Sequence, residues 1–440
     1  MLILKNISHL VVDSKTVLSG ADMRVEGERI AAVGTRLPVP DGAEVVDCAD
    51  CAVLPGLIDA HTHLYQMLLV GRQDDLPLSG WCDEVLGPTV AAMFQRIPRQ
   101  ERERFSYLWT AVGIRELLKS GVTAFVNMDM NFAQDGMFRA ARQTGARGYM
   151  GIELADLFMS TEAGRRRDLA EIERLLKAYP ENCVLTPSEP NVTSEIAMQA
   201  IADLAKAYNA RVQTHVDETA AEARQCIVEK SDPELLYLDR LGLLSPRFSA
   251  VHGVHLNPRE ITLAAERGVS VVYNPKSNAK LGSGVCPIPA LIEAGINIAL
   301  ATDGPASNDR LDMFEEMRAG AMLQKSTSQS PTVITAKDVF SMATSGGAKL
   351  LGLDAGALEA GRLADFSIVP LNRTHLGFGT GDVVSTLVWC AQSGDVKDVY
   401  IGGKPALKGG SVTGFDEAAV LAEFSEILFR LQEEIHAQSK

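Results

Sequence analysis

Two histidines one residue apart, His61 and His63, follow an apolar run at residues 57–60. In a β-strand, residues i and i+2 point to the same face, so both imidazoles would aim at one point. Two convergent imidazoles are what a divalent metal ion requires of a protein. The alternative interpretation is structural, with one histidine ending the strand and the other capping it. The spacing alone leaves both interpretations open.

Three more polar residues, His215, His252 and Asp303, each stand at the end of another apolar run. Taken singly, either histidine could be an ordinary core residue and the aspartate an ordinary turn residue. Taken together, three histidines and one carboxylate suit Zn²⁺, with Fe²⁺ as the alternative. The sequence therefore predicts a single divalent metal held by His61, His63, His215 and Asp303.

The elements that must position these residues alternate regularly along the chain. Eight apolar runs of strand length are separated by segments of helix length. Eight such repeats over about 250 residues are typical of a (β/α)8 barrel, in which chemistry sits at the carboxyl ends of the strands. A doubly wound sheet is the alternative, but eight repeats favour closure. The predicted strands are 57–61, 122–129, 148–154, 183–187, 211–216, 248–252, 269–274 and 296–303.

The sequence pattern at both ends of the chain is typical of β-structure. Alternating runs with a turn at 26–28 precede the barrel, and strand-like runs return after about residue 355. A periodic helix is expected at 415–436. The predicted α/β fold is a TIM-type barrel over 56–355 with a small β-sandwich domain built from 1–55 and 356–440.

Composition narrows the classes of function. The chain has 440 residues, is 46% hydrophobic and carries a net charge of −14, which disfavours a nucleic acid polymer as partner. No apolar run approaches the ~18 residues of a membrane span, and the start of the chain predicts no secretory signal. Seven cysteines, an odd number scattered through apolar runs, suit reduced thiols in the cytoplasm.

The pattern of His61-Thr62-His63, His215 with Glu218 three residues later, His252 and Asp303 resembles that of the amidohydrolase superfamily. The resemblance covers nearly the whole chain and points to the cytosine deaminase and triazine hydrolase branch. Within that branch the pattern is most similar to that of S-adenosylhomocysteine and methylthioadenosine deaminases. Further matches occur in order at residues 251–256, 274–278, 281–284 and 302–308.

The resemblance implies hydrolytic release of ammonia from an amino-substituted nitrogen heterocycle, which could be adenosine-like, a pterin or a triazine. Asp303 would serve as ligand and base, Glu218 would move protons, and His252 would stabilise the tetrahedral intermediate. The alternative for Glu218 is a solvated residue at the start of a helix. Binuclear members carry a lysine at the end of strand four, where this chain has Pro187-Ser188-Glu189, so one metal is predicted.

Substrate contacts are predicted at Gln66, Trp81 and Glu189, although each of these residues could instead have a structural role. Many relatives carry a Pro-His pair near the end of strand four, and its absence here leaves a nucleoside-type substrate open. One alternative function is an s-triazine chlorohydrolase or dealkylaminase that uses the same metal. Another is a non-catalytic scaffold with the same fold. A homodimer or a higher homo-oligomer is expected.

Overall fold

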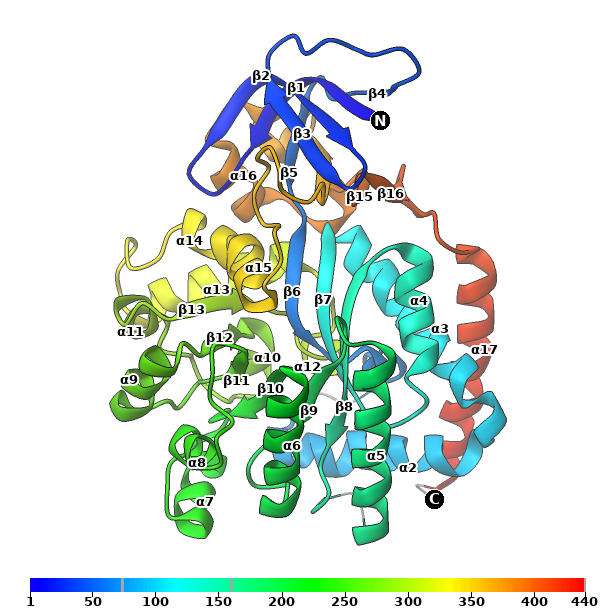
Figure 1. The fold of residues 1–440 in the computed structure, drawn as a ribbon, viewed down its shortest axis with the longest axis vertical. Coiled ribbons are helices and arrows are strands. Elements are labelled where there is room, and N and C mark those ends of the chain that lie inside the picture. Colours follow the sequence, from blue (N-terminus) through cyan, green and yellow to red (C-terminus); the bar gives the residue numbers. More distant parts are fainter. Residues whose placement is uncertain (73–74, 159–160, 439–440) are drawn as a thin grey trace.

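An eight-stranded parallel sheet curls into a nearly closed barrel, and a nine-stranded mixed sheet lies beyond one end of it (Figure 1). The structure is a computed structural model that describes residues 1–72, 75–158 and 161–438. Within these ranges, no helix combines the length and the apolar character needed to cross a membrane. The predicted α/β barrel is confirmed.

The barrel strands follow one another in the order of the sequence, and each pairs in parallel with the next. Their side chains are almost all buried, as expected of strands covered on both faces. The strands are β6 (Leu57–Thr62), β7 (Val122–Asp129), β8 (Arg147–Leu154), β9 (Val184–Pro187), β10 (Arg211–Val216), β11 (Phe248–His252), β12 (Ser270–Tyr273) and β13 (Asn297–Leu300).

Helices surround the barrel (Figure 1). Those from the first half of the chain are η1 (Leu64–Leu68), α1 (Leu78–Trp81), η2 (Cys82–Leu86), α2 (Gly87–Arg96), η3 (Arg99–Glu101), α3 (Arg102–Lys119), α4 (Asp135–Thr144), α5 (Glu162–Ala178) and α6 (Glu195–Tyr208). The second half supplies α7 (Ala220–Lys230), α8 (Glu234–Arg240), α9 (Pro258–Arg267), α10 (Pro275–Lys280), α11 (Ile288–Glu293), α12 (Pro305–Asn308), α13 (Met313–Thr327), α14 (Ala336–Ser341), η4 (Met342–Gly346) and α15 (Gly347–Leu351).

Local sequence fixes where the helices after strands β10 and β11 begin. Thr219 and Glu222 form a capping box at the start of α7, in which each side chain pairs with the backbone of the other residue. Asn257 and Glu260 form the same arrangement at the start of α9, with Pro258 at the first helical position. These caps end the loops that follow His215 and His252, and the first of these loops carries Glu218.

The barrel closes between β6 and β13 through side chains rather than through a ladder. The buried carboxylate of Asp59 accepts from the Thr302 amide at 3.0 Å and from the Thr302 hydroxyl at 2.6 Å. Beside it, the Asp303 amide donates to the His61 carbonyl at 3.0 Å. Burial raises the pKa of Asp59 to about 7, although its hydrogen bonds to Thr302 oppose that rise. This seam sets the strand-one histidines against Asp303.

Asp59→Ala is expected to lower the free energy of unfolding by about 2–3 kcal/mol, because it leaves the buried Thr302 amide without an acceptor and takes the shorter of two hydrogen bonds from the Thr302 hydroxyl. The midpoint of urea unfolding measures this change. The exposed carboxylate of Asp41 supplies the matched control, since Asp41→Ala should leave the midpoint unchanged. Equal midpoints for the two variants would show that Asp59 does not hold the seam.

Both ends of the chain meet in the mixed sheet, whose order is β17-β16-β15-β14-β5-β1-β2-β3, with β4 on β1. Strand β14 pairs antiparallel with β5, which joins the two ends directly. The strands are β1 (Leu2–Val11), β2 (Val17–Glu26), β3 (Arg29–Gly34), β4 (Glu44–Asp47), β5 (Cys51–Pro55), β14 (Phe366–Pro370), β15 (Asp398–Ile401), β16 (Lys404–Lys408) and β17 (Ser411–Val412). The division of the chain at residues 55 and 356 remains a prediction.

The amino ends of the barrel strands face this mixed sheet. Gly121, which precedes β7, lies so close to Ser367 of β14 that a Cβ on it would come within 3.3 Å of the Ser367 hydroxyl. The carboxyl ends of the strands therefore open at the far end of the barrel.

Four further helical segments follow the barrel: η5 (Thr374–Gly379), α16 (Val383–Cys390), η6 (Ser393–Asp395) and α17 (Glu417–Gln438). The last of these is the expected C-terminal helix, and it runs along the outside of the barrel beside α3 (Figure 1). Arg115 of α3 holds Glu417 at 2.5 Å.

Candidate metal centre and active site

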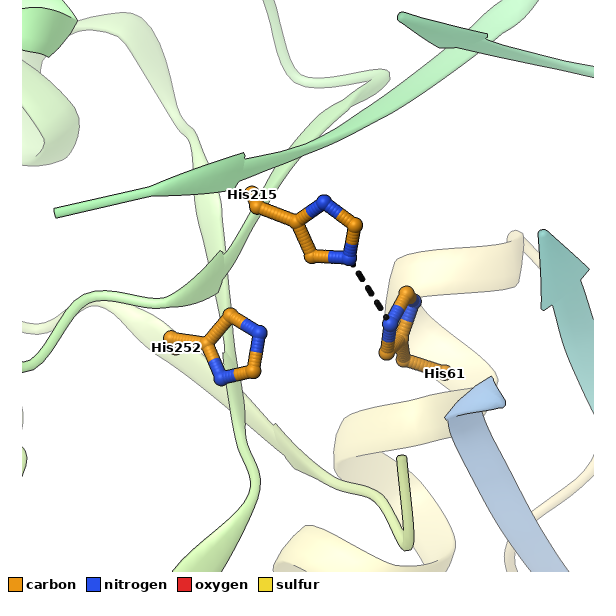
Figure 2. A group of neighbouring side chains, drawn as sticks. All are labelled: His61, His215 and His252. Atoms are coloured by element: carbon orange, nitrogen blue, oxygen red, sulfur yellow. Dashed lines mark hydrogen bonds between the residues drawn. The ribbon is translucent and has the colours of Figure 1, made fainter. Parts of the chain in front are cut away.

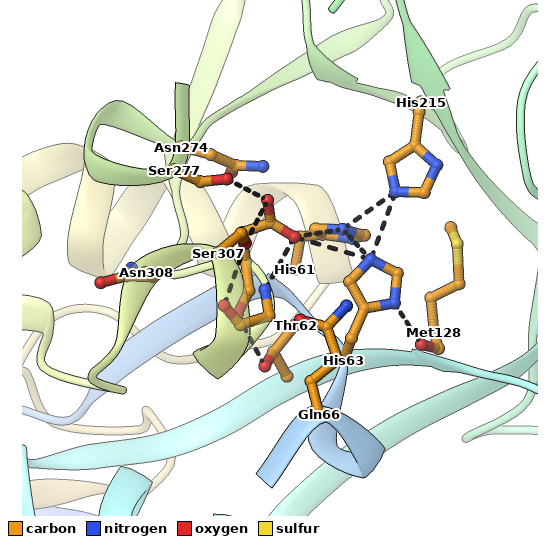
Figure 3. Close-up of polar contacts among 12 residues, drawn as sticks. His61, Thr62, His63, Gln66, Met128, His215, Asn274, Ser277, Ser307 and Asn308 are labelled. Carbon is orange, nitrogen blue, oxygen red and sulfur yellow. Dashed lines mark hydrogen bonds and ion pairs between the residues drawn. The ribbon is translucent and has the colours of Figure 1, made fainter. Parts of the chain in front are cut away.

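Three imidazoles from two barrel strands converge at the carboxyl end of the barrel. The Nε2 atoms of His61 and His63 are 3.1 Å apart, and each lies 3.3 Å from Nε2 of His215 (Figure 3). Strand β6 brings the two nearby histidines to one face, as the i, i+2 spacing predicts. Strand β10 brings the third from the opposite side. The structure therefore places these three predicted ligands around one point.

The outer nitrogen of each ring is held by a carbonyl oxygen. Nδ1 of His61 donates to the Gln213 side chain at 2.8 Å, and Nδ1 of His63 donates to the Met128 carbonyl at 2.6 Å. Nδ1 of His215 donates to the Ser188 carbonyl at 2.8 Å. Because Nδ1 carries the proton in each ring, each Nε2 presents a lone pair to the same centre. Three lone pairs at this separation repel one another unless a cation lies between them.

Asp303 completes the donor set. Its Oδ1 lies 3.5 Å from Nε2 of both His61 and His63, and its Oδ2 accepts from the Ser277 hydroxyl at 2.5 Å. Asp303 adopts a left-handed backbone with φ of 63°, and the seam described above fixes that turn. Burial would raise the pKa of Asp303, but the imidazoles of His61, His252 and His63 outweigh it and hold the pKa well below its usual range.

The size of this donor set fits a small divalent cation. The three Nε2 atoms form a triangle with edges of 3.1 to 3.3 Å, whose centre lies about 1.9 Å from each atom, close to the Zn–N distance found in proteins. Two overlapping groups of side chains offer ligand atoms within 4.8 Å of one another, His61 with His63 and Asp303, and His61 with His215 and His252. The three nitrogens and one oxygen suit zinc or iron better than the hard cations that prefer oxygen.

His252 belongs to a different set of contacts. Its Nε2 lies 3.2 Å from Oε2 of Glu218, while its Nδ1 accepts from the side-chain amides of Asn278 at 2.9 Å and Asn274 at 3.2 Å. Figure 2 shows its ring set apart from the contact that joins His215 and His61. Because two donors face Nδ1, the proton of a neutral ring sits on Nε2. His252 is therefore arranged as a hydrogen-bond donor rather than as a ligand.

Glu218 is buried and faces His252. Its Oε1 accepts from the Ser283 hydroxyl at 3.1 Å. Burial raises the pKa of Glu218 well above its ordinary value, and the carboxylates of Glu222 and Asp303 raise it further. Burial also lowers the pKa of His252 to about 3, so this ring is neutral. A carboxyl group that burial makes easier to protonate thus stands beside a neutral imidazole.

The three predicted substrate contacts lie in different surroundings. Gln66 is buried under the loop after β13, where its Oε1 accepts from the Ala306 amide at 3.4 Å. A Cβ on Gly304 would come within 1.8 Å of that oxygen, so the glycine lets the Gln66 side chain lie against this loop. Trp81 is buried in the apolar core at the end of α1. Their contacts with a substrate remain predictions.

Glu189 is half-buried at the end of strand four, in a group of carboxylates on neighbouring loops. Burial raises its pKa well above the ordinary value, and Glu222 and Glu153 raise it further. Glu153 accepts from the Ser188 hydroxyl at 2.7 Å. Among the described residues, no lysine or arginine forms an ion pair with any of these three carboxylates.

Several residues of the site have no role in the sequence prediction. Gln213 fixes the His61 ring, Ser277 holds Asp303, and the two asparagines hold His252. Residues 274–278 are part of the motif that carries the family resemblance. Asn274 and Asn278 are four residues apart around the start of α10, and this spacing is the signal that could have assigned both side chains to His252. Gln213 lies two residues before His215 and so shares its face of the strand.

Comparisons with known proteins agree with this geometry. The amidohydrolase family profile matches residues 52–406. A 5-methylthioadenosine/S-adenosylhomocysteine deaminase of Thermococcus kodakarensis is 36% identical over 408 residues, which cover 92% of this chain and 93% of that protein. A 5'-deoxyadenosine deaminase of Methanothermobacter thermautotrophicus is 35% identical over 417 residues, which cover 93% and 94%.

Two solved structures share the fold. A zinc-bound adenosine deaminase from Xanthomonas campestris superposes with a TM-score of 0.89 at 31% identity, over 99% of this chain and 98% of the other. An atrazine chlorohydrolase from Arthrobacter aurescens superposes with a TM-score of 0.90 at 22% identity, over 97% of this chain and 100% of the other.

Proposed function

Because the chain belongs to the amidohydrolase family, we propose that it deaminates an amino-substituted nitrogen heterocycle by hydrolysis and releases ammonia. The observation that carries the proposal is the convergence of three Nε2 atoms, two of them 3.5 Å from Asp303, beside the pair of Glu218 and His252. Relatives named as deaminases of adenosine-type compounds favour that class of substrate over a pterin or a triazine.

His61, His63, His215 and Asp303 would hold a single zinc ion, with iron as the alternative. The zinc-bound deaminase from Xanthomonas campestris supports this choice. The bound cation supplies Lewis acidity that makes a water molecule nucleophilic near neutral pH.

Glu218, Asp303 and His252 each have a part in the proton transfers of the proposed reaction. Glu218, whose pKa is raised well above the ordinary value by burial, can in its protonated form donate to the ring nitrogen beside the attacked carbon, which would otherwise accumulate negative charge. Asp303, whose pKa is held well below its usual range, can accept one proton from the attacking water. After its first donation, Glu218 can take the remaining hydroxyl proton of that water and pass it to the departing amine. Return of the Asp303 proton to Glu218 then restores both side chains. His252 can donate from Nε2 to the oxygen that develops charge. Ammonia leaves with the third proton it needs.

The test is a heterocycle panel assayed for ammonia, chloride and alkylamine, with the metal content of the purified protein measured in parallel. We expect one equivalent of divalent metal and ammonia from adenosine-type compounds. Chloride or alkylamine release without ammonia would overturn deamination in favour of s-triazine hydrolysis. Metal-free protein that turns over none of the compounds would favour a non-catalytic scaffold.

Glu189, Gln66 and Trp81 would contact the heterocycle or its substituent. Glu189→Gln is expected to raise KM about tenfold for a substrate that donates an N–H or an ammonium group to this position, since a hydrogen bond to a charged partner is lost. The value of kcat should change little, because Glu189 makes no contact with the metal ligands. Glu181→Gln, at an exposed carboxylate just before strand four, is the control. An unchanged KM for every ammonia-yielding substrate would remove Glu189 from the binding site.

The protein is proposed to be cytoplasmic and to form a homo-oligomer. All seven cysteines are free thiols, which favours the reducing cytoplasm. A homodimer or a higher homo-oligomer is proposed, and light scattering of the purified protein would measure its mass.

A further inference from the structure

Glu218 lies in a turn that the strand does not impose by itself. Strand β10 ends at Val216, and the next residue, Asp217, adopts a left-handed backbone with φ of 49°. Side chains other than glycine, asparagine and aspartate strongly disfavour this conformation, and even aspartate adopts it only where its neighbours fix it. The turn redirects the chain so that Glu218 faces His252 and Ser283.

The contacts that fix the turn come from Glu234 at the start of α8 and from His255 after β11. The carboxylate of Glu234, at the start of α8, accepts from the Asp217 amide at 2.8 Å. The Asp217 carbonyl in turn accepts from the His255 amide at 3.0 Å. Glu234 is 1% exposed, so water does not compete for this amide. Both backbone groups of Asp217 are therefore held.

Glu234 is itself immobilised by two neighbouring loops. Its other oxygen accepts from the Asn191 side chain at 3.4 Å, and the same amide group reaches the Glu222 carbonyl at 3.3 Å. The adjacent Leu235 amide donates to the buried carboxylate of Glu260 at 3.1 Å. A buried carboxylate at Glu234 is costly to maintain, and no lysine or arginine among the described residues forms an ion pair with it. Its role as a backbone acceptor accounts for its presence.

We propose that Glu234 is a positioning residue for the reaction, which fixes the turn at Asp217 and thereby holds the Glu218 carboxyl against His252. The inference rests on the proposed function for its catalytic consequence, since Glu234 itself touches neither the ligands nor Glu218. A misplacement of a reacting group by about 1 Å can cost 100-fold in rate.

Glu234→Ala and Glu234→Gln test the inference together. Glu234→Ala is expected to lower kcat about 100-fold while KM and metal content stay near wild type. Glu234→Gln keeps an oxygen for the Asp217 amide, and its new amide group can pair with Asn191 Oδ1, which is buried and without a partner among the described residues. The glutamine variant should therefore recover kcat to within about threefold of wild type.

The control is Asp365→Ala, which removes an equally buried carboxylate that pairs with Arg147 at 2.7 Å near the mixed sheet. This variant should lose stability without losing kcat per bound metal. A crystal structure of Glu234→Ala provides a readout that needs no substrate, because the distance from Glu218 Oε2 to His252 Nε2, now 3.2 Å, should lengthen.

An unmoved Glu218 in that crystal structure would overturn the inference, as would a glutamine variant as impaired as the alanine variant. A wild-type protein that releases no ammonia from any heterocycle would overturn the proposed function. The crystal structure would still decide the role of Glu234.

Discussion

Glu218→Gln is expected to lower kcat by about 1,000- to 10,000-fold, the upper range for loss of a general acid and base. Glutamine keeps the size of the side chain and can still accept from Ser283, which is 3.1 Å away in the wild type. It cannot supply a proton to the ring nitrogen or carry one to the departing amine. Because Glu218 is outside the donor set, metal content and KM should stay near wild type. Steady-state kinetics with metal analysis of the same preparation measures all three quantities.

The pH dependence of the wild type gives a second check on Glu218. Its pKa is raised well above the ordinary value, chiefly by burial and then by Glu222 and Asp303. The protonated form is the active acid, so kcat should be maintained below that raised pKa and fall as the pH rises through it. The glutamine variant should lack this alkaline decline.

Glu229→Gln, on the exposed side of α7, is the matched control and should leave kcat unchanged. A Glu218→Gln variant within tenfold of wild type would show that another group moves the proton. Loss of metal from that variant would show that Glu218 contributes to the metal site instead.

The barrel could be predicted from the sequence because its strands are largely buried on both faces and read as short, mainly apolar runs separated by segments of helix length. Strands 122–129, 211–216 and 248–252 were predicted with the bounds that the structure shows. The seventh and eighth strands were predicted too long at both ends, since 269–274 and 296–303 include residues that flank the ladders of β12 and β13 without pairing in them. Asp303 lies beyond β13, and its left-handed backbone cannot be part of a strand.

The grouping of the proposed metal ligands could be predicted because each stands at the end of an apolar run of the sequence. The contacts that orient them could not. The partner of His63 is the backbone carbonyl of Met128, and that of His215 is the carbonyl of Ser188, and a carbonyl has no sequence signature. The role of Glu234 could not be predicted either, because its partner is the backbone amide of Asp217.

The geometry around His252 leads to a prediction about the tautomer of a catalytic imidazole. Two asparagine amides donate to Nδ1, so the ring proton points from Nε2 toward Glu218. Burial and the metal-binding imidazoles hold His252 neutral, and its pKa is lowered to about 3. A neutral ring has one proton to place, and the partners of Nδ1 decide where it goes.

Asn278→Asp should therefore impair the enzyme more than a variant that only deletes the contact. A carboxylate at this position accepts the ring proton at Nδ1 and leaves Nε2 as a lone pair, unable to donate to the developing oxyanion. We expect kcat to fall at least 100-fold, since a wrong tautomer in a catalytic histidine can cost about 10,000-fold. Asn278→Leu, of similar volume and without a polar group, leaves Asn274 as the donor and should lose about tenfold.

The test is which of the two variants, Asn278→Asp or Asn278→Leu, loses more kcat. If only the hydrogen bond from residue 278 mattered, both variants would lose kcat equally. Steady-state kcat, corrected for bound metal, measures that order. Metal content should be unchanged in both variants, because His252 is not among the four donors around the centre. Equal losses in kcat, or a leucine variant worse than the aspartate variant, would show that the asparagines support the ring sterically and do not set its proton. The aspartate variant can be inactive only through chemistry, provided that its thermal unfolding midpoint matches that of the leucine variant.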